Sequence, residues 1–458
     1  MKSIYLSPKN LIFKSSVAND KIYIREQSGR FQHIRRRLNI VLLAIFALAP
    51  LIKYNDTQAI YFDLQQQQFH VFSLTLFPQD LLIVCLLFVS AAFLLFYVTK
   101  LFGRVWCGFT CPQTIWMLMF NWVERRIEGS HSKSKSLDSQ PLNIKKLVKK
   151  SLKHFIWASI SLLTALVFIS YFVPVEQLYK PFFTMQASSL VVSWVIFFSV
   201  CTYINAGWIR EKMCQHMCPY ARFQSAMFDK STKLVSYDAI RGENRGKRKR
   251  SQVKNTDMGD CVDCNLCVQV CPVGIDIRNG LQYECINCGL CVDACDMTMD
   301  KFNYDKGLIA FTSEKTARNG WKRHALYGSF ILLTFTAIFV WAQTWQNFDV
   351  NIIRDRHALY RVNQHGHIEN AFVFKVRNKS NQVKHYKIDV TGLSNAKIIG
   401  QSNIEVMPLE LKTFSVAVEA NEQPSQKRKT IGFNITNLDD KSSVLKNSSF
   451  HSGDGGWE

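Results

Sequence analysis

Eight of the fourteen cysteines lie between Cys261 and Cys295, and their spacing is typical of iron–sulfur ligands. The chain reads C-V-D-C-N-L-C-V-Q-V-C-P from Cys261 and C-I-N-C-G-L-C-V-D-A-C from Cys285. Both motifs are C-x2-C-x2-C-x3-C, in which the fourth cysteine of each motif binds the cluster of the other motif. We therefore predict two [4Fe-4S] clusters, one held by Cys261, Cys264, Cys267 and Cys295 and the other by Cys271, Cys285, Cys288 and Cys291.

A pair of zinc sites is the main competing interpretation of these motifs. Zinc ribbons use two C-x2-C pairs that are well separated, rather than three evenly spaced cysteines followed by a fourth. Disulfides are disfavoured because the rest of the chain does not resemble a small secreted domain. Asp296 follows Cys295 where the ferredoxin pattern often has proline, which affects a turn but not the number of ligands.

Four further cysteines form a second internal repeat. Residues 106–113 read W-C-G-F-T-C-P-Q and residues 213–220 read M-C-Q-H-M-C-P-Y, so each contains C-x3-C-P. Because proline suits the first turn of a helix, Cys111 and Cys218 are expected at helix N-caps. There the helix dipole and free amides can lower the pKa of a thiol.

Three interpretations of this second repeat remain open. Cysteines are often buried and inert, and each motif could also form a reversible disulfide. The third interpretation is a site for Cu(I), which soft thiolate and thioether ligands favour. Met213, His216 and Met217 add soft or borderline ligands to the second motif and give modest support to copper.

Five apolar runs predict that most of the remaining chain lies in a membrane. A membrane-spanning helix needs about 20 largely apolar residues; one run is short for this and four are long enough. No cleavable signal peptide is expected, since the first 30 residues are polar. The predicted spans are Leu38–Ile52, Leu81–Val98, Phe155–Val173, Leu190–Ile209 and Ala325–Ala342.

The basic residues predict the orientation of these spans. Lys and Arg gather before the first span and after the second and fourth spans, whereas the loops at 53–80 and 174–189 carry few. By the positive-inside rule, the N-terminus and the cluster segment are cytoplasmic and the C-terminal tail lies outside. The net charge of +21 therefore belongs to loops beside the membrane, where it suits anionic lipid headgroups, and it does not predict nucleic-acid binding.

The tail after residue 343 alternates in the manner of β-strands. The runs at 371–376, 413–418 and 430–436 alternate apolar and polar residues, which suggests a β-sandwich of immunoglobulin-like architecture. The predicted fold is therefore a multi-domain α-helical polytopic membrane protein with an inserted two-[4Fe-4S] ferredoxin-like α+β domain. The predicted parts are a cytoplasmic segment (1–37), a membrane domain with spans one to four (38–225), the ferredoxin-like domain (226–324), span five (325–342) and a periplasmic β domain (343–458).

Several tracts resemble one known family over nearly the whole chain. They include W-C-G-F-T-C-P-Q-T-I-W, E-R-R-I-E-G, C-P-Y-A-R-F-Q-S-A-M-F-D, G-L-Q-Y-E-C-I-N-C, F-H-V-F-S-L-T-L-F-P-Q-D and R-G-E-N-R-G-K-R-K-R. Together these are similar to the cytochrome c oxidase accessory protein CcoG, also called FixG or RdxA.

The resemblance implies a role in assembling cbb3-type oxidases in a bacterial inner membrane. It implies two [4Fe-4S] clusters and reduction of Cu(II) to Cu(I), with copper as the substrate and oxidase subunits or copper chaperones as partners. The candidate catalytic and copper-binding residues are then Cys107, Cys111, Cys214 and Cys218. The alternatives are a quinol-linked electron relay of the NapH type without copper, or a non-enzymatic assembly scaffold. The electron donor is left open.

Overall fold

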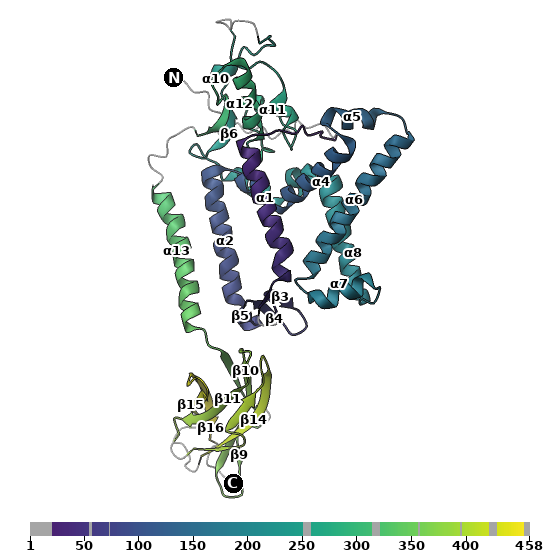
Figure 1. Cartoon of the computed structure of the whole chain (residues 1–458). Helices are drawn as coiled ribbons and strands as arrows, with labels where there is room; N and C mark the ends of the chain where they lie inside the picture. The colour runs from purple at the N-terminus through teal and green to yellow at the C-terminus, as the bar shows by residue number, and fades with distance from the viewer. Residues whose placement is uncertain are drawn as a thin grey trace. The chain divides into compact units, whose positions relative to one another are not determined.

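The structure is a computed structural model in which the chain forms two compact units, residues 1–338 and 339–458 (Figure 1). It describes residues 21–54, 57–72, 74–250, 258–313, 321–355, 358–393, 396–420 and 428–452. The first unit contains the membrane helices and the cluster segment, and the second is the β-rich tail. The boundary between the units falls inside the fifth predicted span.

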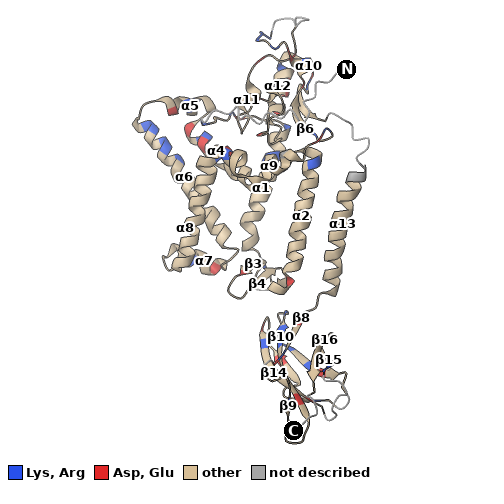
Figure 2. Ribbon diagram, turned by 180° about the vertical axis from the view of Figure 1, so that it is seen from behind, with Lys and Arg blue, Asp and Glu red and all other residues tan. Residues whose placement is uncertain are grey.

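Four helices of the described chain are long and apolar enough to cross a membrane. Only 6% of the apolar window of α13 is buried within the protein, compared with 33% for α6, so α13 is peripheral and α6 is central. The Lys and Arg residues of α6 lie in its N-terminal turns (Figure 2). The four are α2 (Leu81–Phe102), α6 (Ile144–Ile169), α8 (Ser189–Tyr203) continued by a π-helix (Ile204–Ile209), and α13 (Trp321–Thr344).

Most of the first predicted span lies in α1 (Arg30–Leu48), and its last residues lie in a short 3-10 helix (Ala49–Leu51) and just beyond it. The helix α1 is not among the four long apolar helices because its first half is charged. The N-terminal end of α1 contacts the cluster segment, and its C-terminal end contacts the chain just after α6. At the N-terminus of α1, the Asp293 carboxylate accepts hydrogen bonds from the amides of Phe31 and Gln32. Near the C-terminus of α1, the Tyr171 hydroxyl donates to Phe46 O at 2.8 Å. A fifth crossing by α1 stays a prediction.

The predicted spans differ from the helices mainly at their ends. The helix α6 begins eleven residues before the predicted Phe155 because its early turns are basic, and it ends at Ile169.

Neighbouring helices are antiparallel: Ser90 of α2 pairs with Thr334 of α13, and Tyr97 pairs with His324. The connections contain α3 (Val105–Phe109), α4 (Pro112–Glu128), α5 (His131–Ser139) and α7 (Val175–Phe183).

Residues 53–80 form short strands at the end of the bundle remote from the cluster segment. The amide of Phe62 donates to Tyr171 O, just after the end of α6. The strands β3 (Ile60–Asp63), β4 (Gln68–Val71) and β5 (Leu74–Leu76) make one antiparallel sheet, beside a two-stranded ladder of β1 (Lys53–Tyr54) and β2 (Thr57–Gln58).

The cluster segment packs directly on the bundle and on the N-terminal residues. Its two-stranded sheet pairs β6 (Leu234–Tyr237) with β7 (Ile309–Thr312), and its helices are α10 (Ala239–Gly242), α11 (Leu266–Gln269) and α12 (Leu290–Phe302). The amide of Arg25 donates to Gln269 O at 2.8 Å. The N-terminal segment therefore covers the cluster segment, which its sequence did not predict.

The second unit is a sandwich of two antiparallel sheets, which confirms the predicted immunoglobulin-like architecture. One sheet has the order β12-β14-β10-β8, with β9 also paired to β10, and the other has the order β13-β11-β15-β16. Phe372, Phe374 and Phe433 are fully buried between the sheets. The strands are β8 (Phe348–Arg354), β9 (Arg361–Val362), β10 (Ile368–Asn378), β11 (Lys384–Thr391), β12 (Lys397–Ile399), β13 (Asn403–Val406), β14 (Leu411–Ala420), β15 (Arg428–Asn437) and β16 (Ser443–His451).

Candidate iron–sulfur centres and thiol site

The two C-x2-C-x2-C-x3-C motifs fold in the same way. Asp263 and Asn287, which precede the second cysteine of each motif, have φ of 50° and 51°. Asn265 and Gly289, which follow that cysteine, have φ of 57° and 72°. This left-handed region suits Asn, Asp and Gly, so each loop turns back on itself before α11 or α12 begins.

One cavity, which we call the first cavity, is lined by cysteines of both motifs. The lining sulfur residues are Cys261, Cys264, Cys267 and Cys295, and Arg278 and Tyr237 also face it. Cys264 is exposed. These four cysteines are the set that the sequence assigned to one cluster.

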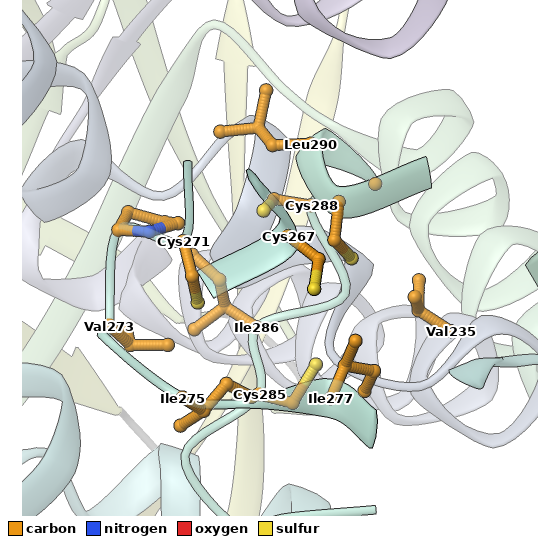
Figure 3. Close-up of a pocket in the computed structure, with 13 residues that line it drawn as sticks. Val235, Cys267, Cys271, Val273, Ile275, Ile277, Cys285, Ile286, Cys288 and Leu290 are labelled. Atoms are coloured by element: carbon orange, nitrogen blue, oxygen red, sulfur yellow. The ribbon is translucent and has the colours of Figure 1, made fainter. Parts of the chain in front are cut away.

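The second cavity lies on the other side of Cys267. Figure 3 shows the sulfur atoms of Cys267, Cys271, Cys285 and Cys288 directed toward a shared space. Cys291 completes the sulfur lining, and the remaining lining is largely apolar. Each cavity has an empty volume of about 360 Å³, which includes space open to solvent. Cys267 lines both cavities, so the two sites are neighbours.

The donor sets fit iron–sulfur clusters better than single metal ions. In the described part of the chain, no three His, Cys, Asp or Glu side chains are close enough together to hold one ion. Each cysteine of a [4Fe-4S] cluster binds a different iron, so the sulfurs stand further apart than the ligands of one zinc ion. Four cysteines line the first cavity, and four besides the shared Cys267 line the second. Such a set of thiols, with an otherwise mostly apolar lining, is the environment that a [4Fe-4S] cluster requires.

Replacing Cys295 tests the exchange of ligands between the motifs. Although Cys295 belongs to the second motif, it lines the first cavity. Cys295→Ala is therefore expected to damage the cluster of the first cavity and leave the other intact. Electron paramagnetic resonance of the reduced protein, with iron analysis, would show one normal [4Fe-4S] signal. Disruption of the second-cavity cluster alone would contradict this assignment of ligands.

The two C-x3-C-P motifs adopt the predicted local structure. Cys111 is the N-cap of α4 with Pro112 in the first turn, and Cys218 is the N-cap of α9 (Pro219–Ala226). Cys107 lies in α3, and Cys214 lies in the π-helical turn Met213–Met217.

The four thiols of these motifs gather at one place, which we call the thiol site. Cys107 and Cys214 each interact electrostatically with both Cys111 and Cys218, and all four are free thiols. Burial raises the pKa of Cys107 to about 11 and that of Cys214 to about 12. Neutral thiols of this kind must lose protons when they bind a metal.

The expected lowering of the Cys111 pKa by its N-cap position is wrong. Burial raises the pKa of Cys111, although the amides of Thr114 and Gln113 act in the opposite direction. The loss of solvent around a thiolate outweighs the two amides, because a buried negative charge is costly.

The thiol site lies against the second cavity. Cys107 shares a buried apolar core with Cys271, Cys288 and Ile286, and the Gln215 side chain donates to Val273 O at 3.2 Å. Gly108 makes this approach possible, because a Cβ atom there would lie 2.6 Å from Ile286 O. Sequence spacing alone did not show which cluster is nearest to the thiols, although the glycine inside the first C-x3-C-P motif is a signal of close backbone approach.

The fold and these sites together define a membrane iron–sulfur electron-transfer protein. A family described as a 4Fe-4S dicluster domain matches residues 209–314. A second family, described as the IG-like fold at the C-terminal of FixG, putative oxidoreductase, matches residues 338–453.

Similar proteins span most of the chain. The nitrogen fixation protein FixG of Rhizobium meliloti is 31% identical over an alignment of 427 positions, and the match covers 83% of this chain and 82% of that protein. Protein RdxA of Cereibacter sphaeroides is 35% identical over 84% of this chain and 86% of its own length, and RdxB of the same organism is 33% identical over 89% and 88%. The crystal structure of a FixG-related protein from Vibrio parahaemolyticus is 30% identical, covers 23% of this chain and 97% of that one, and has a TM-score of 0.22. The chain belongs to the FixG/RdxA family.

Proposed function

We propose that this protein reduces Cu(II) to Cu(I) at the thiol site during maturation of a cbb3-type cytochrome oxidase. The observation that carries the proposal is the packing of Cys107 in one core with Cys271 and Cys288. A site that could receive copper thus adjoins a site that suits an electron carrier.

The thiol site supplies ligands suited to the reduced ion. Thiolates favour Cu(I), whereas Cu(II) prefers nitrogen and oxygen ligands in tetragonal geometry. Two or more of the cysteines Cys107, Cys111, Cys214 and Cys218 would therefore bind the product of the reduction more strongly than the substrate, releasing their protons as they do so. Binding by three or more of them would require a shift of the thiols, because no three of these described side chains lie close enough together to hold one ion. When bound, the clusters supply single electrons.

The proposed setting is the bacterial inner membrane. The basic end of α6 favours the cytoplasmic side for the cluster segment, and the β-sandwich would then be periplasmic. There it could meet the oxidase subunits or copper chaperones that receive Cu(I). A cytoplasmic flavoprotein, a soluble ferredoxin and membrane quinol are all compatible electron donors.

An anaerobic stopped-flow experiment tests copper reduction. Dithionite-reduced, desalted protein is mixed with Cu(II) and a Cu(I)-specific chromophore, and cluster reoxidation is followed together with Cu(I) formation. Replacing all four thiol-site cysteines by serine is expected to slow both signals by about 10–100-fold or more, the scale of effect of losing support for a metal ligand.

The matched control replaces Cys85 and Cys201 by serine, because these exposed cysteines lie within α2 and α8, away from the thiol site. This variant is expected to react like the wild type. Equal rates in the wild type and the quadruple variant, with clusters intact in both, would show that copper is reduced without the thiol site and would refute the proposal.

A quinol-linked relay is a second candidate, and a cavity in the membrane domain favours it. A space of about 680 Å³, which includes space open to solvent, is lined by Phe46, Trp116 and Phe198 together with Gln113 and Asn205. Within the described chain, the buried Asn205 Oδ1 has no hydrogen-bond partner. An aromatic head group with a hydroxyl donor would suit this space. Rapid reduction of the oxidised clusters by a soluble quinol, with no reaction toward Cu(II), would favour this candidate.

A further inference from the structure

The second cavity has a buried arginine, Arg35, beside it. Arg35 is fully buried, and within the described chain none of its guanidinium nitrogens has a hydrogen-bond partner. Its electrostatic partners are the ligand candidates Cys288 and Cys271. An unpaired buried charge is strongly destabilising, so this guanidinium requires an anion in the second cavity.

The packing of α1 fixes the position of Arg35. Phe31, four residues earlier on the same face of α1, packs so tightly on Gly289 that a Cβ there would lie 2.7 Å from the Phe31 ring. Gly289 directly follows Cys288. The Asp293 carboxylate accepts the first amides of α1 and fixes the end of the helix against α12.

Arg104 is a second buried cation that acts on the cysteines of the same cavity. It is 1% exposed and donates to Tyr283 O at 2.7 Å. It interacts electrostatically with Cys285 and with the thiol-site residues Cys107 and Cys214. The carboxylate of Glu284 is also near Cys285, so two cations and one anion act on this cavity.

The first cavity has a different charge environment. Its lining arginine, Arg278, is paired with two carboxylates, Asp263 and Asp276, each at 2.6 Å. The negative charge of Asp276 also acts on Cys267, and that of Asp296 acts on Cys295. The cation of the first cavity is therefore neutralised, whereas those of the second cavity are in excess.

We propose that the buried positive charges of Arg35 and Arg104 set the reduction potential of the second-cavity cluster above that of the first-cavity cluster. Reduction adds one negative charge to a cluster, and net charge and burial are among the factors that tune its potential. Two buried guanidiniums favour the more negative state. They therefore hold the electron on the side of the protein where the thiol site lies.

The test is a redox titration of the full-length protein in detergent, followed by electron paramagnetic resonance. The wild type is expected to show two one-electron steps. Arg35→Gln is expected to lower only the upper step, with at least about a tenfold fall in the ratio of reduced to oxidised cluster at a fixed potential, equivalent to about 59 mV. Arg35→Lys, which keeps the charge, is expected to retain most of the wild-type value.

Arg36→Gln is the matched control, because Arg36 is the next residue of α1 and forms an exposed ion pair with Glu26. It is expected to leave both steps unchanged. If the Arg35→Gln protein does not bind both clusters, the Arg104→Gln protein takes its place, and its upper step is expected to be lowered in the same way. An unchanged upper step in the loaded variants, or a shift confined to the lower step, would overturn the proposal.

The inference rests on the electron-transfer role of the two cluster sites and not on copper. A protein that shows the expected potentials but does not reduce Cu(II) would refute the proposed function and leave this inference standing. A protein that reduces Cu(II) but does not show the expected potentials would refute this inference and leave the proposed function standing.

Discussion

A protein carrying Gly108→Ala is expected to lose one of its two clusters, the one whose cavity lies against α3. The added Cβ would lie 2.6 Å from Ile286 O and 2.9 Å from the Cys288 Cα. Both are backbone atoms of the loop that carries the ligands, so no side-chain rotation relieves the clash. Forcing an extra carbon into a packed contact costs about 1–3 kcal/mol. Here that cost falls on the loop that must surround the cluster.

Iron and sulfide analysis with electron paramagnetic resonance measures this effect. The Gly108→Ala protein should contain about half of the iron of the wild type, and its remaining signal should belong to the first cavity. Gly328→Ala is the matched control, because a Cβ on this glycine of α13 meets no atom within 4 Å. Full loading of both clusters in Gly108→Ala at the wild-type potentials would show that α3 does not press on the ligand loop.

Much of the cluster chemistry could be predicted because it depends on motifs of residues that are close together in the sequence. The ligand spacing of Cys261 to Cys295 determines a loop geometry that repeats almost to the degree at Asp263 and Asn287. The apolar runs likewise predicted the cores of the membrane helices, and alternation predicted the strands of the sandwich. These features depend on residues that are near one another in the chain.

The features that the sequence did not predict depend on contacts between distant residues. The pairing of the thiol site with the second cavity follows from α3 meeting residues 286–288, about 180 positions away. In the sequence, Arg35 belongs to a group of basic residues that precedes a predicted membrane span. In the structure, the packing of α1 buries Arg35 beside Cys288. The Cys111 pKa was mispredicted for the same reason, because burial comes from surrounding elements and not from the N-cap motif.

A second large effect, on the stability of the fold, is expected when Glu124 is replaced. Glu124 is a residue of α4 that is 7% exposed, and its carboxylate faces three cations. Arg210 Nη2 lies 2.7 Å from one of its oxygens, and Lys21 Nζ lies 2.7 Å from the other. Lys153 of α6 lies at 3.6 Å. Glu124 thus joins the N-terminal segment, α4, α6 and the chain after α8. Glu124→Gln would leave the buried Arg210 without its carboxylate partner, whereas Lys21 keeps Asp138 and Lys153 keeps Glu128. Breaking a buried pair in this way costs about 3–5 kcal/mol.

Thermal unfolding in detergent, followed by tryptophan fluorescence, measures this loss at pH 7. Glu176→Gln is the matched control, because Glu176 forms an exposed ion pair with Lys53, and its midpoint should not change. A Glu124→Gln midpoint equal to that of the wild type would contradict a structural role for the carboxylate.

The pH dependence provides an independent check on the Glu124 network. Burial alone would raise the pKa of Glu124, but Arg210, Lys21 and Lys153 outweigh it and lower the pKa from 4.5 to about 2. Because the folded-state pKa is the lower one, the carboxylate contributes its full stability above about pH 5 and loses it as the pH falls toward 2. The difference in unfolding midpoint between the wild type and Glu124→Gln should therefore be constant from pH 8 to pH 6 and begin to narrow below about pH 5. A difference that grows as the pH falls would mean that the carboxylate is protonated more readily in the folded protein than in the unfolded chain, which the three neighbouring cations forbid.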